Sequence, residues 1–323
     1  MLSGKIALVT GGSRGVGRGI ALALGERRAT VYVTGRTVAS AVPPEPGTIE
    51  HVAREVDRLG GRGVAVRCDH DRPEEIGALF ARIASEAGRL DVLVNNAHSG
   101  VADLLGNVDR RFWEIDPGLW DRMNDAGLRG HYVASVHAAR LMVPRRSGLI
   151  VNVSSFCSLT YLASVPYGVG KAALDRMTRD VAHELRTEGV AVVSVWPGLV
   201  RTELTDALLR DATPGYRRIL DAYGEPPSRT GRAVAALASD PHVLRHSGEA
   251  LIAAEVMRAY RVYEEDGRYP RSPRSLTVLA AALLPARYRA LAAAVPPWNV
   301  PRALVAPVLR RFSDVLRQHG GFK

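Results

Sequence analysis

Short apolar runs alternate with longer amphipathic segments along the first 200 residues. The runs are apolar at consecutive positions, as in Leu149-Ile150-Val151, which is typical of parallel strands buried on both faces. This pattern predicts strands at Ile6–Thr10, Thr30–Thr34, Gly63–Cys68, Asp91–Val94, Leu149–Val153 and Val190–Val195. The segments between them have helical periodicity, which predicts helices at Gly15–Arg27, Thr48–Leu59, Pro73–Ala87, Leu119–Val143 and Val165–Thr187.

This alternation predicts an α/β fold: a doubly wound parallel sheet, or Rossmann fold, with helices on both faces. Residues 37–47 contain three prolines and predict a loop insertion before a helix that starts at Thr48. The alternation stops near residue 255. We therefore expect a single domain over residues 1–255, followed by a helical C-terminal extension over residues 256–323.

Two regions outside the regular pattern bear on function. Residues 199–227 follow the last predicted strand and combine several prolines and glycines with a short helical segment. In the extension, segments 276–294 and 302–317 combine leucine and alanine with arginine. Such pieces fit a cleft cover or a subunit contact, or else helices lying on a membrane surface. The first reading is favoured, because 276–294 is too short and interrupted to span a bilayer.

Composition narrows the compartment and the partners. The chain is 46% apolar, enough for a full core, and its two cysteines, Cys68 and Cys157, indicate no disulfide framework. With no signal peptide and no apolar stretch of 18 residues, a cytoplasmic location is expected. The net charge is +10, but arginines are scattered among acids and lysine occurs only at positions 5, 171 and 323. We therefore expect a solvated basic surface, no nucleic acid and no metal site.

A glycine-rich turn joins the first predicted strand to the first helix. Glycines allow the backbone to turn tightly beside a pyrophosphate, and the helix N-terminus offers free N–H groups and positive potential. This position predicts a dinucleotide site formed by Gly11, Ser13, Arg14, Gly15, Val16 and Gly17.

The end of the second strand bears on which dinucleotide binds. An acidic residue there would favour NAD through the ribose hydroxyls. The sequence instead reads Val33-Thr34-Gly35-Arg36, without an acid. Arg36, together with Arg14 in the glycine loop, can pair with a 2′-phosphate through its forked donors. The sequence therefore predicts NADP(H), with NAD(H) as the alternative.

Tyr167 and Lys171 form the most informative pair in the chain. A spacing of four residues places both side chains on one face of a helix. A free phenol has a pKa near 10, and a neighbouring ammonium lowers that pKa by stabilising the phenolate. Ser154 and Ser155 end the fifth strand, where a hydroxyl can polarise a substrate carbonyl in the ligand crevice. These residues predict general acid–base chemistry on a carbonyl or an alcohol.

Together these motifs resemble the short-chain dehydrogenase/reductase family over residues 3–255. The resemblance rests on residues 10–17 (TGGSRGVG), Asp69, Asn95-Asn96-Ala97, Ser154-Ser155, Tyr167-x-x-x-Lys171 and Trp196-Pro197-Gly198. Longer segments such as VPYGVGKAALDRMT and SVWPGLVRTEL are similar in particular to a group of animal members and their bacterial relatives. The resemblance implies a homo-oligomeric enzyme with a small carbonyl or alcohol substrate. It also implies a substrate lid over residues 199–227.

The resemblance also implies a role for each matching residue. Tyr167 would protonate the carbonyl oxygen, and Lys171 would lower the pKa of Tyr167 and hold the nicotinamide ribose. A serine would orient the carbonyl. Strand register selects Ser155, whereas counting back from Tyr167 selects Ser154, and we favour strand register. Further cofactor contacts are implied for Asp69 at the adenine, for Asn95, and for a nicotinamide pocket made by Pro197, Gly198, Val200 and Thr202.

Two positions depart from the family pattern. Gly127 stands where the family usually has an asparagine, whose backbone carbonyl holds a water that hydrogen-bonds the lysine; glycine keeps that carbonyl. His98 replaces a glycine after Asn-Asn-Ala, and we interpret it as a loop histidine rather than a pocket residue. The expected function is reduction of a ketone or aldehyde, or oxidation of the matching alcohol. Gly127 alone favours the alternative, a catalytically weak NADP-binding sensor or scaffold.

Overall fold

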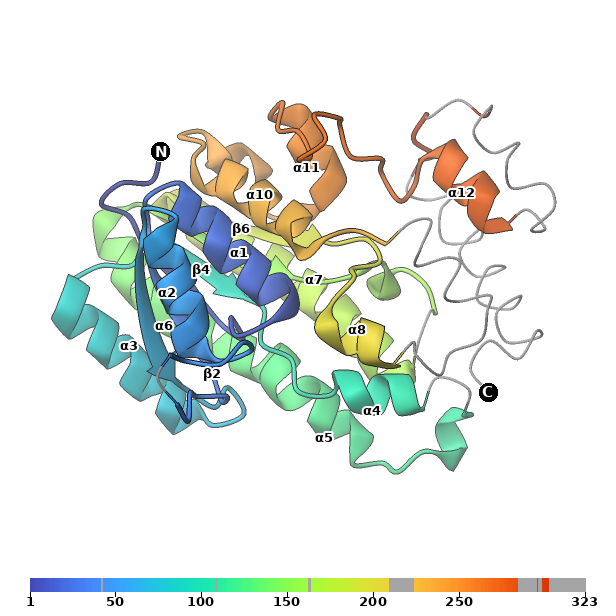
Figure 1. Ribbon diagram of the computed structural model, residues 1–323, viewed down its shortest axis with the longest axis horizontal. Coiled ribbons are helices and arrows are strands. Elements are labelled where there is room, and N and C mark those ends of the chain that lie inside the picture. Colours follow the sequence, from blue (N-terminus) through green and yellow to red (C-terminus); the bar gives the residue numbers. More distant parts are fainter. Residues whose placement is uncertain are drawn as a thin grey trace.

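The computed structural model describes residues 1–41, 43–107, 110–161, 164–208, 224–283, 295 and 298–301. It confirms the predicted fold class: a seven-stranded sheet in the order β3-β2-β1-β4-β5-β6-β7, with every neighbouring pair parallel. Figure 1 shows the sheet among its helices. The strands are β1 (Ile6–Val9), β2 (Thr30–Gly35), β3 (Arg62–Arg67), β4 (Val92–Asn95), β5 (Gly148–Val153), β6 (Val190–Trp196) and β7 (Ala250–Ile252).

The strand order reverses between β1 and β4. The chain runs outward from β1 through β2 to β3, then returns to β4 on the other side of β1. Such a switch point opens a crevice beyond the carboxyl ends of the strands, where ligands bind in open α/β sheets. Val9 of β1 lies in register with Val33 and Val94, so these strands end together at the crevice.

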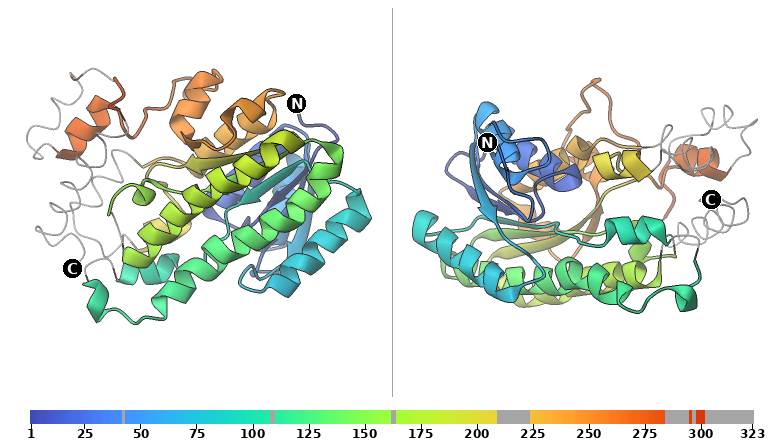
Figure 2. Two further views of the ribbon diagram at one scale, coloured as in Figure 1. Left: turned by 180° about the vertical axis from the view of Figure 1, so that it is seen from behind. Right: turned by 60° about the horizontal axis from the view of Figure 1, so that its bottom comes forward.

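Helices cover both faces of the sheet (Figure 2). One face packs α1 (Gly15–Glu26), α2 (Ile49–Arg58), α10 (Pro227–Ala238) and α11 (Ala253–Ala259). The other packs α3 (Pro73–Ala87), α6 (His131–Met142) and α7 (Val165–Leu185). Alternate strand residues serve the two layers: Val9 and Val151 join the first core, while Leu8 and Ile150 join the second. This alternation explains why the strands read as unbroken apolar runs.

The prediction of one continuous helix at Leu119–Val143 is wrong in one respect, its continuity. The segment is divided into α5 (Leu119–Asn124), a π-helical turn (Asp125–Gly130) and α6. The turn contains Gly127 and Gly130, which have low helix propensity, and single π turns are frequent at functional sites. The elements that were not predicted include β7 and the short α4 (Val101–Gly106), because three and six residues are too few to show a period.

The predicted loop insertion and the C-terminal region are described in part. Thr48 caps α2, as expected, by accepting a hydrogen bond from the His51 N–H at 3.3 Å. Of residues 199–227, where the lid is expected, the structure describes 199–208, which include α8 (Glu203–Leu208), and 224–227; residues 209–223 lie outside the described residues. The first extension segment begins with α12 (Leu276–Leu283), and its remainder and segment 302–317 also lie outside them. No helix in the described ranges is long and apolar enough to cross a membrane.

Candidate active site

The carboxyl end of β5 and the first turns of α7 bring the predicted catalytic residues together. α7 begins at a Ser164 cap, whose hydroxyl accepts a hydrogen bond from the Tyr167 N–H at 3.4 Å. One helical turn later, the Lys171 ammonium donates to the carbonyl oxygen of Val153, the last residue of β5, at 2.9 Å. Lys171 is buried, with 7% of its surface exposed. The strand thus fixes the ammonium beside the strand-end serines.

The two candidate serines face different ways. Ser154 is 3% exposed and donates to the backbone carbonyl of Lys171 at 3.3 Å, which turns its hydroxyl toward the α7 backbone. Ser155 caps the following 3-10 turn, accepting from the Cys157 N–H at 3.1 Å, and it lies near enough to Tyr167 to lower the pKa of the phenol. The structure therefore brings Ser155, rather than Ser154, to Tyr167.

The acid–base properties of the pair differ from the expectation. Burial raises the pKa of Tyr167 above its ordinary value, and the neighbouring Ser155 opposes this rise. The Lys171 Nζ lies 5.6 Å from the centre of the Tyr167 ring and does not produce the net lowering that the spacing suggested. The pKa of Lys171 itself is lowered to about 8, chiefly by burial. Desolvation, which disfavours both charged forms, outweighs the pairing.

Asp175 is a neighbour of Lys171 that the sequence reading missed. It lies one turn further along α7, is 5% exposed, and its negative charge raises the pKa of Lys171 against the effect of burial. Its carboxylate accepts hydrogen bonds from the Ser194 hydroxyl at 2.5 Å and the Trp196 indole N–H at 3.1 Å. An acid four residues after a predicted catalytic lysine was the available signal.

His98 is not an ordinary loop histidine. Its ring packs edge-on against Tyr167, with 5.5 Å between ring centres and an interplanar angle of 74°. Burial lowers the pKa of His98 to about 3, so the imidazole is neutral. A Cβ atom added to Gly127 would lie 2.9 Å from His98 Cδ2, which is closer than van der Waals contact. The two departures from the family pattern therefore form one packing unit: the absent side chain at 127 makes room for the ring at 98.

Tight packing also explains Gly170, between Tyr167 and Lys171. A Cβ atom there would lie 2.1 Å from the side-chain oxygen of Asn124 in α5. Asn124 is itself fixed, since its amide donates to the Trp120 carbonyl at 3.0 Å. This glycine lets α7 approach α5 closely and so sets the position of the helix that carries the reactive pair.

The glycine loop has the shape of an anion site. Gly11 has a φ of 63°, and a Cβ there would lie 2.8 Å from Ala97 Cα, so the position requires glycine. The Asn96 amide fastens the loop by donating to the carbonyls of Thr10 and Gly11 at 2.9 and 3.0 Å. At the start of α1, the Gly15 N–H donates to the Glu203 carboxylate of α8 at 3.3 Å. A carboxylate thus lies at the helix N-terminus, which attracts anions.

The remaining loop residues lie where the sequence placed them. Ser13 is 8% exposed beside Gly35 of β2, and Val16 packs on the core under α1. Gly17 sits against the Gly11 carbonyl, where a Cβ would lie 2.2 Å from the oxygen.

The two predicted cofactor arginines come from different elements: Arg14 caps α1, and Arg36 follows β2. Arg14 reaches across to Thr37, donating to its hydroxyl at 3.1 Å. Arg36 pairs with Asp71 at 3.5 Å, and 54% of its side chain is exposed. Asp69 follows β3 at the same edge and accepts from the Asp71 N–H at 3.2 Å. The structure therefore gathers Arg14, Arg36 and Asp69, and it adds Asp71, which no sequence motif marked.

Asn95 has a structural role within the sheet. Its side chain is completely buried, and its amide donates to Asn152 at 2.8 Å and Ser135 at 3.0 Å, joining β4 to β5 and α6. Through these contacts the side chain holds β4 to its neighbours. The cofactor contact expected for Asn95 stays a prediction. Its neighbour Asn96, which fastens the glycine loop, has the more direct link to the expected dinucleotide site.

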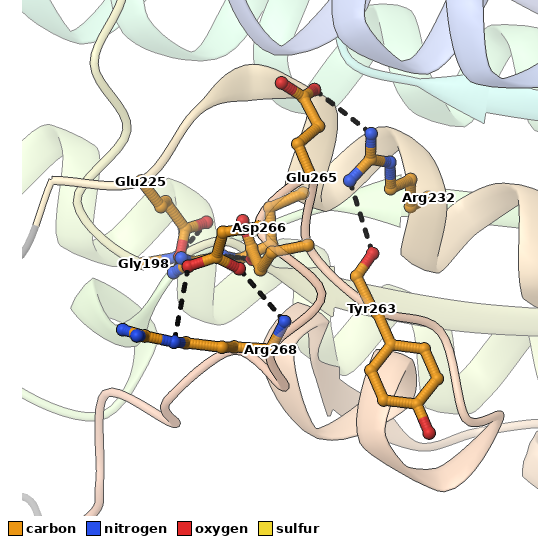
Figure 3. A network of polar contacts seen from close by, with 9 residues as sticks. Gly198, Glu225, Arg232, Tyr263, Glu265, Asp266 and Arg268 are labelled. Atoms are coloured by element: carbon orange, nitrogen blue, oxygen red, sulfur yellow. Dashed lines mark hydrogen bonds and ion pairs between the residues drawn. The ribbon is translucent and has the colours of Figure 1, made fainter.

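The segment after β6 completes the crevice. It contains Pro197, Gly198, Val200 and Thr202, all partly exposed. The Thr202 methyl would lie 3.2 Å from a Cβ on Gly15, so this segment reaches the glycine loop. Figure 3 shows Gly198 beside Glu225, whose carboxylate accepts from the Gly198 N–H at 2.9 Å. Within the described part of the chain, no group of three histidine, cysteine or acidic side chains could hold a metal ion.

Comparison with known proteins agrees with this geometry. The family model for short chain dehydrogenase matches residues 5–213. Dehydrogenase/reductase SDR family member 1 of Mus musculus is 46% identical over 274 residues, covering 83% of this chain and 85% of the mouse protein.

Two solved structures share the fold. A metagenomic short-chain oxidoreductase in complex with NADP is 29% identical, with a TM-score of 0.60, covering 74% of this chain and 92% of that chain. A 7α-hydroxysteroid dehydrogenase in complex with NADH and 7-oxo glycochenodeoxycholic acid is 26% identical, with a TM-score of 0.66, covering 78% and 93%. The chain belongs to the short-chain dehydrogenase/reductase family, whose enzymes use nicotinamide cofactors to act on alcohol and carbonyl groups.

Proposed function

We propose that this protein is an NADP(H)-dependent oxidoreductase that reduces a ketone or aldehyde, or oxidises the matching alcohol. One observation carries the proposal: the Ser155 hydroxyl, the Tyr167 phenol and the Lys171 ammonium meet at the carboxyl end of β5. A hydrogen-bond donor for a carbonyl, an acid to protonate it and a buried cation are what carbonyl reduction needs from a protein.

The residues around the crevice fit a dinucleotide. The N-terminus of α1 and the loop at Gly11, where a Cβ would collide with Ala97, suit a pyrophosphate. Asp69 would contact the adenine. Arg14, which reaches Thr37 just beyond β2, and Arg36, which follows β2, would hold a 2′-phosphate. Lys171 would hold the nicotinamide ribose, and the segment Pro197, Gly198, Val200 and Thr202 would line the nicotinamide end.

The arginine pair is the reason for preferring NADP(H). The two solved relatives bind different cofactors, NADP in one and NADH in the other, so likeness alone does not choose. In this chain, β2 ends in Gly35 followed by Arg36, and no acid stands at the ribose position. Planar guanidinium groups match phosphate in charge and geometry, which favours the phosphorylated cofactor.

The bound cofactor would supply the hydride. The protein would then act at the carbonyl oxygen. The Ser155 hydroxyl would donate a hydrogen bond that orients and polarises the carbonyl, and Tyr167 would transfer its phenolic proton to the oxygen. Lys171 retains N–H donors beyond the bond to Val153, and its charge would stabilise the phenolate left on Tyr167. Asp175 would keep Lys171 protonated by raising its pKa.

A cofactor-oxidation assay tests the proposal. The purified protein is mixed with NADPH or NADH and a panel of ketones, aldehydes, quinones and steroids, and the absorbance of the reduced cofactor is followed. We expect turnover of at least one class with NADPH, and weaker turnover with NADH. Tight NADPH binding without turnover across the panel would instead support the alternative, a sensor or scaffold.

A further inference from the structure

Glu225 is a buried carboxylate that the proposed mechanism does not use. It is 1% exposed and stands immediately before α10. One carboxylate oxygen accepts from the Gly198 N–H at 2.9 Å, and the other accepts from Arg229 at 2.8 Å. A buried charge is costly unless it is paired and hydrogen-bonded, and here both oxygens have partners. Glu225 therefore joins the segment after β6 to α10.

The backbone of Glu225 holds the same segment a second time. Its N–H donates to the Leu199 carbonyl at 2.8 Å, and its carbonyl accepts from the Arg201 N–H at 2.9 Å. These bonds form a parallel bridge between Val200 and Glu225. The segment that reaches Gly15 is thus held at Gly198 by a side chain and around Val200 by the backbone.

The contact continues into the C-terminal extension. Arg229 also donates to Glu264 at 2.6 Å, and each of these two side chains is only 16% exposed. Glu264 lies beyond α11, in the segment leading to α12. Gly198, Glu225, Arg229 and Glu264 thereby form one continuous polar chain. Residues near the nicotinamide end of the crevice are linked by it to residues outside the core sheet.

A second point of the extension lies directly against Gly198. A Cβ on Gly198 would lie 3.3 Å from the ring of Pro273. The next residue, Arg274, is fixed to Glu255 of α11 by two bonds of 2.6 and 2.9 Å. The extension thus packs on the segment after β6 as well as pairing with it through Glu264.

We propose that Glu225 is a positioning residue that sets the nicotinamide-binding segment at Gly198, and that the C-terminal extension supports it through Glu264 and Arg229. The proposal rests on the function proposed above, because it assumes that this segment contacts the nicotinamide. On this proposal the extension acts at the nicotinamide half of the cofactor. The adenosine half would be held elsewhere, by Arg14 and Arg36.

Cofactor binding to the full-length protein tests the proposal. Dissociation constants are measured by titration for NADPH and for adenosine 2′,5′-bisphosphate, which lacks the nicotinamide half. We expect Glu225→Ala and Glu225→Gln to weaken NADPH about tenfold, since a charge-assisted bond is lost, and to leave the bisphosphate within about twofold. Glu264→Gln leaves Glu225 in place, so it should weaken NADPH by a smaller factor.

Glu265→Gln is the matched control. Glu265 lies next to Glu264 and pairs with Arg232 of α10 at 3.0 Å, but this pair is separate from Gly198 and Glu265 is 79% exposed (Figure 3). Glu265→Gln should leave the dissociation constants for NADPH and for the bisphosphate unchanged. If Glu225→Ala unfolds, the glutamine variants decide the question.

Two results would overturn the proposal: NADPH bound equally by the wild type and the glutamine variants, or NADPH and the bisphosphate weakened by the same factor. A wild-type protein that binds neither NADPH nor NADH would instead defeat the proposed function, and this proposal with it.

Discussion

The contact between His98 and Gly127 predicts a strong energetic coupling between the two positions. In Gly127→Ala, the new Cβ would lie 2.9 Å from His98 Cδ2, and the His98 ring also packs against Tyr167. Overpacking a core typically costs about 1–3 kcal/mol. Alanine recovers up to about 1 kcal/mol over glycine in a helical segment. We therefore expect Gly127→Ala to lower the free energy of unfolding by about 1–2 kcal/mol.

The same substitution should behave differently once the ring is removed. In a His98→Ala background nothing remains for the new Cβ to strike, so Gly127→Ala should be neutral or stabilising by up to about 1 kcal/mol. The difference between backgrounds is a coupling energy of about 2 kcal/mol. Urea unfolding of the wild type, the two single variants and the double variant measures this coupling energy, with one shared slope of unfolding free energy against urea concentration.

An equal effect of Gly127→Ala in both backgrounds would refute this reasoning. It would mean that the ring at 98 moves away freely, and that the two departures from the family pattern are independent. The backbone of Gly127 does not complicate the test, because it lies outside the left-handed region and alanine can adopt it.

Three further predictions concern the cofactor site and the buried lysine. Glu203→Gln removes the negative charge that lies beside the Gly15 N–H at the start of α1, where it competes with an anionic ligand. Calorimetry should therefore show NADPH binding roughly two- to fivefold more tightly, and weaker binding would contradict this. Activity that depends on the Lys171 ammonium is expected to fall as pH rises through about 8, and Asp175→Asn removes the charge that raises this pKa. In pH–rate profiles the fall should therefore move to lower pH in the variant, and an unchanged position of the fall would contradict this. Arg36→Ala should weaken NADPH about tenfold and NADH by less than about twofold in parallel titrations, and equal losses would remove the case for a 2′-phosphate site.

The sequence predicted those parts of the fold that depend on local patterns. β5 was readable because its residues are buried on both sides, and α2 because Thr48 caps its first turn. The π turn at Asp125–Gly130 was not readable, because the same residues fit a regular helical period. β7 has only three residues, too few to show any period.

The active site was predictable where motif order and spacing define it. Tyr167 and Lys171 share one helix face, so their proximity followed from their spacing. The choice between Ser154 and Ser155 depended on strand register, and the structure places Ser155 with Tyr167.

Contacts between distant segments were not predictable. Gly127 meets His98, and Glu225 meets Gly198, only after the whole sheet has formed, and no periodic pattern records such pairs. The acid–base balance was missed for a related reason. Burial outweighs the lysine in setting the pKa of Tyr167, and burial of a side chain depends on segments remote in the sequence.

The central claim is that Tyr167 supplies the proton in a cofactor-dependent carbonyl reduction. It is tested most directly by comparing kcat and the dissociation constant for NADPH between the wild type and Tyr167→Phe, with one carbonyl substrate. Phenylalanine keeps the ring that packs against His98 but removes the proton. The account predicts a loss in kcat of roughly 100-fold to 10,000-fold, with NADPH binding almost unchanged. Equal turnover by the two proteins would contradict it.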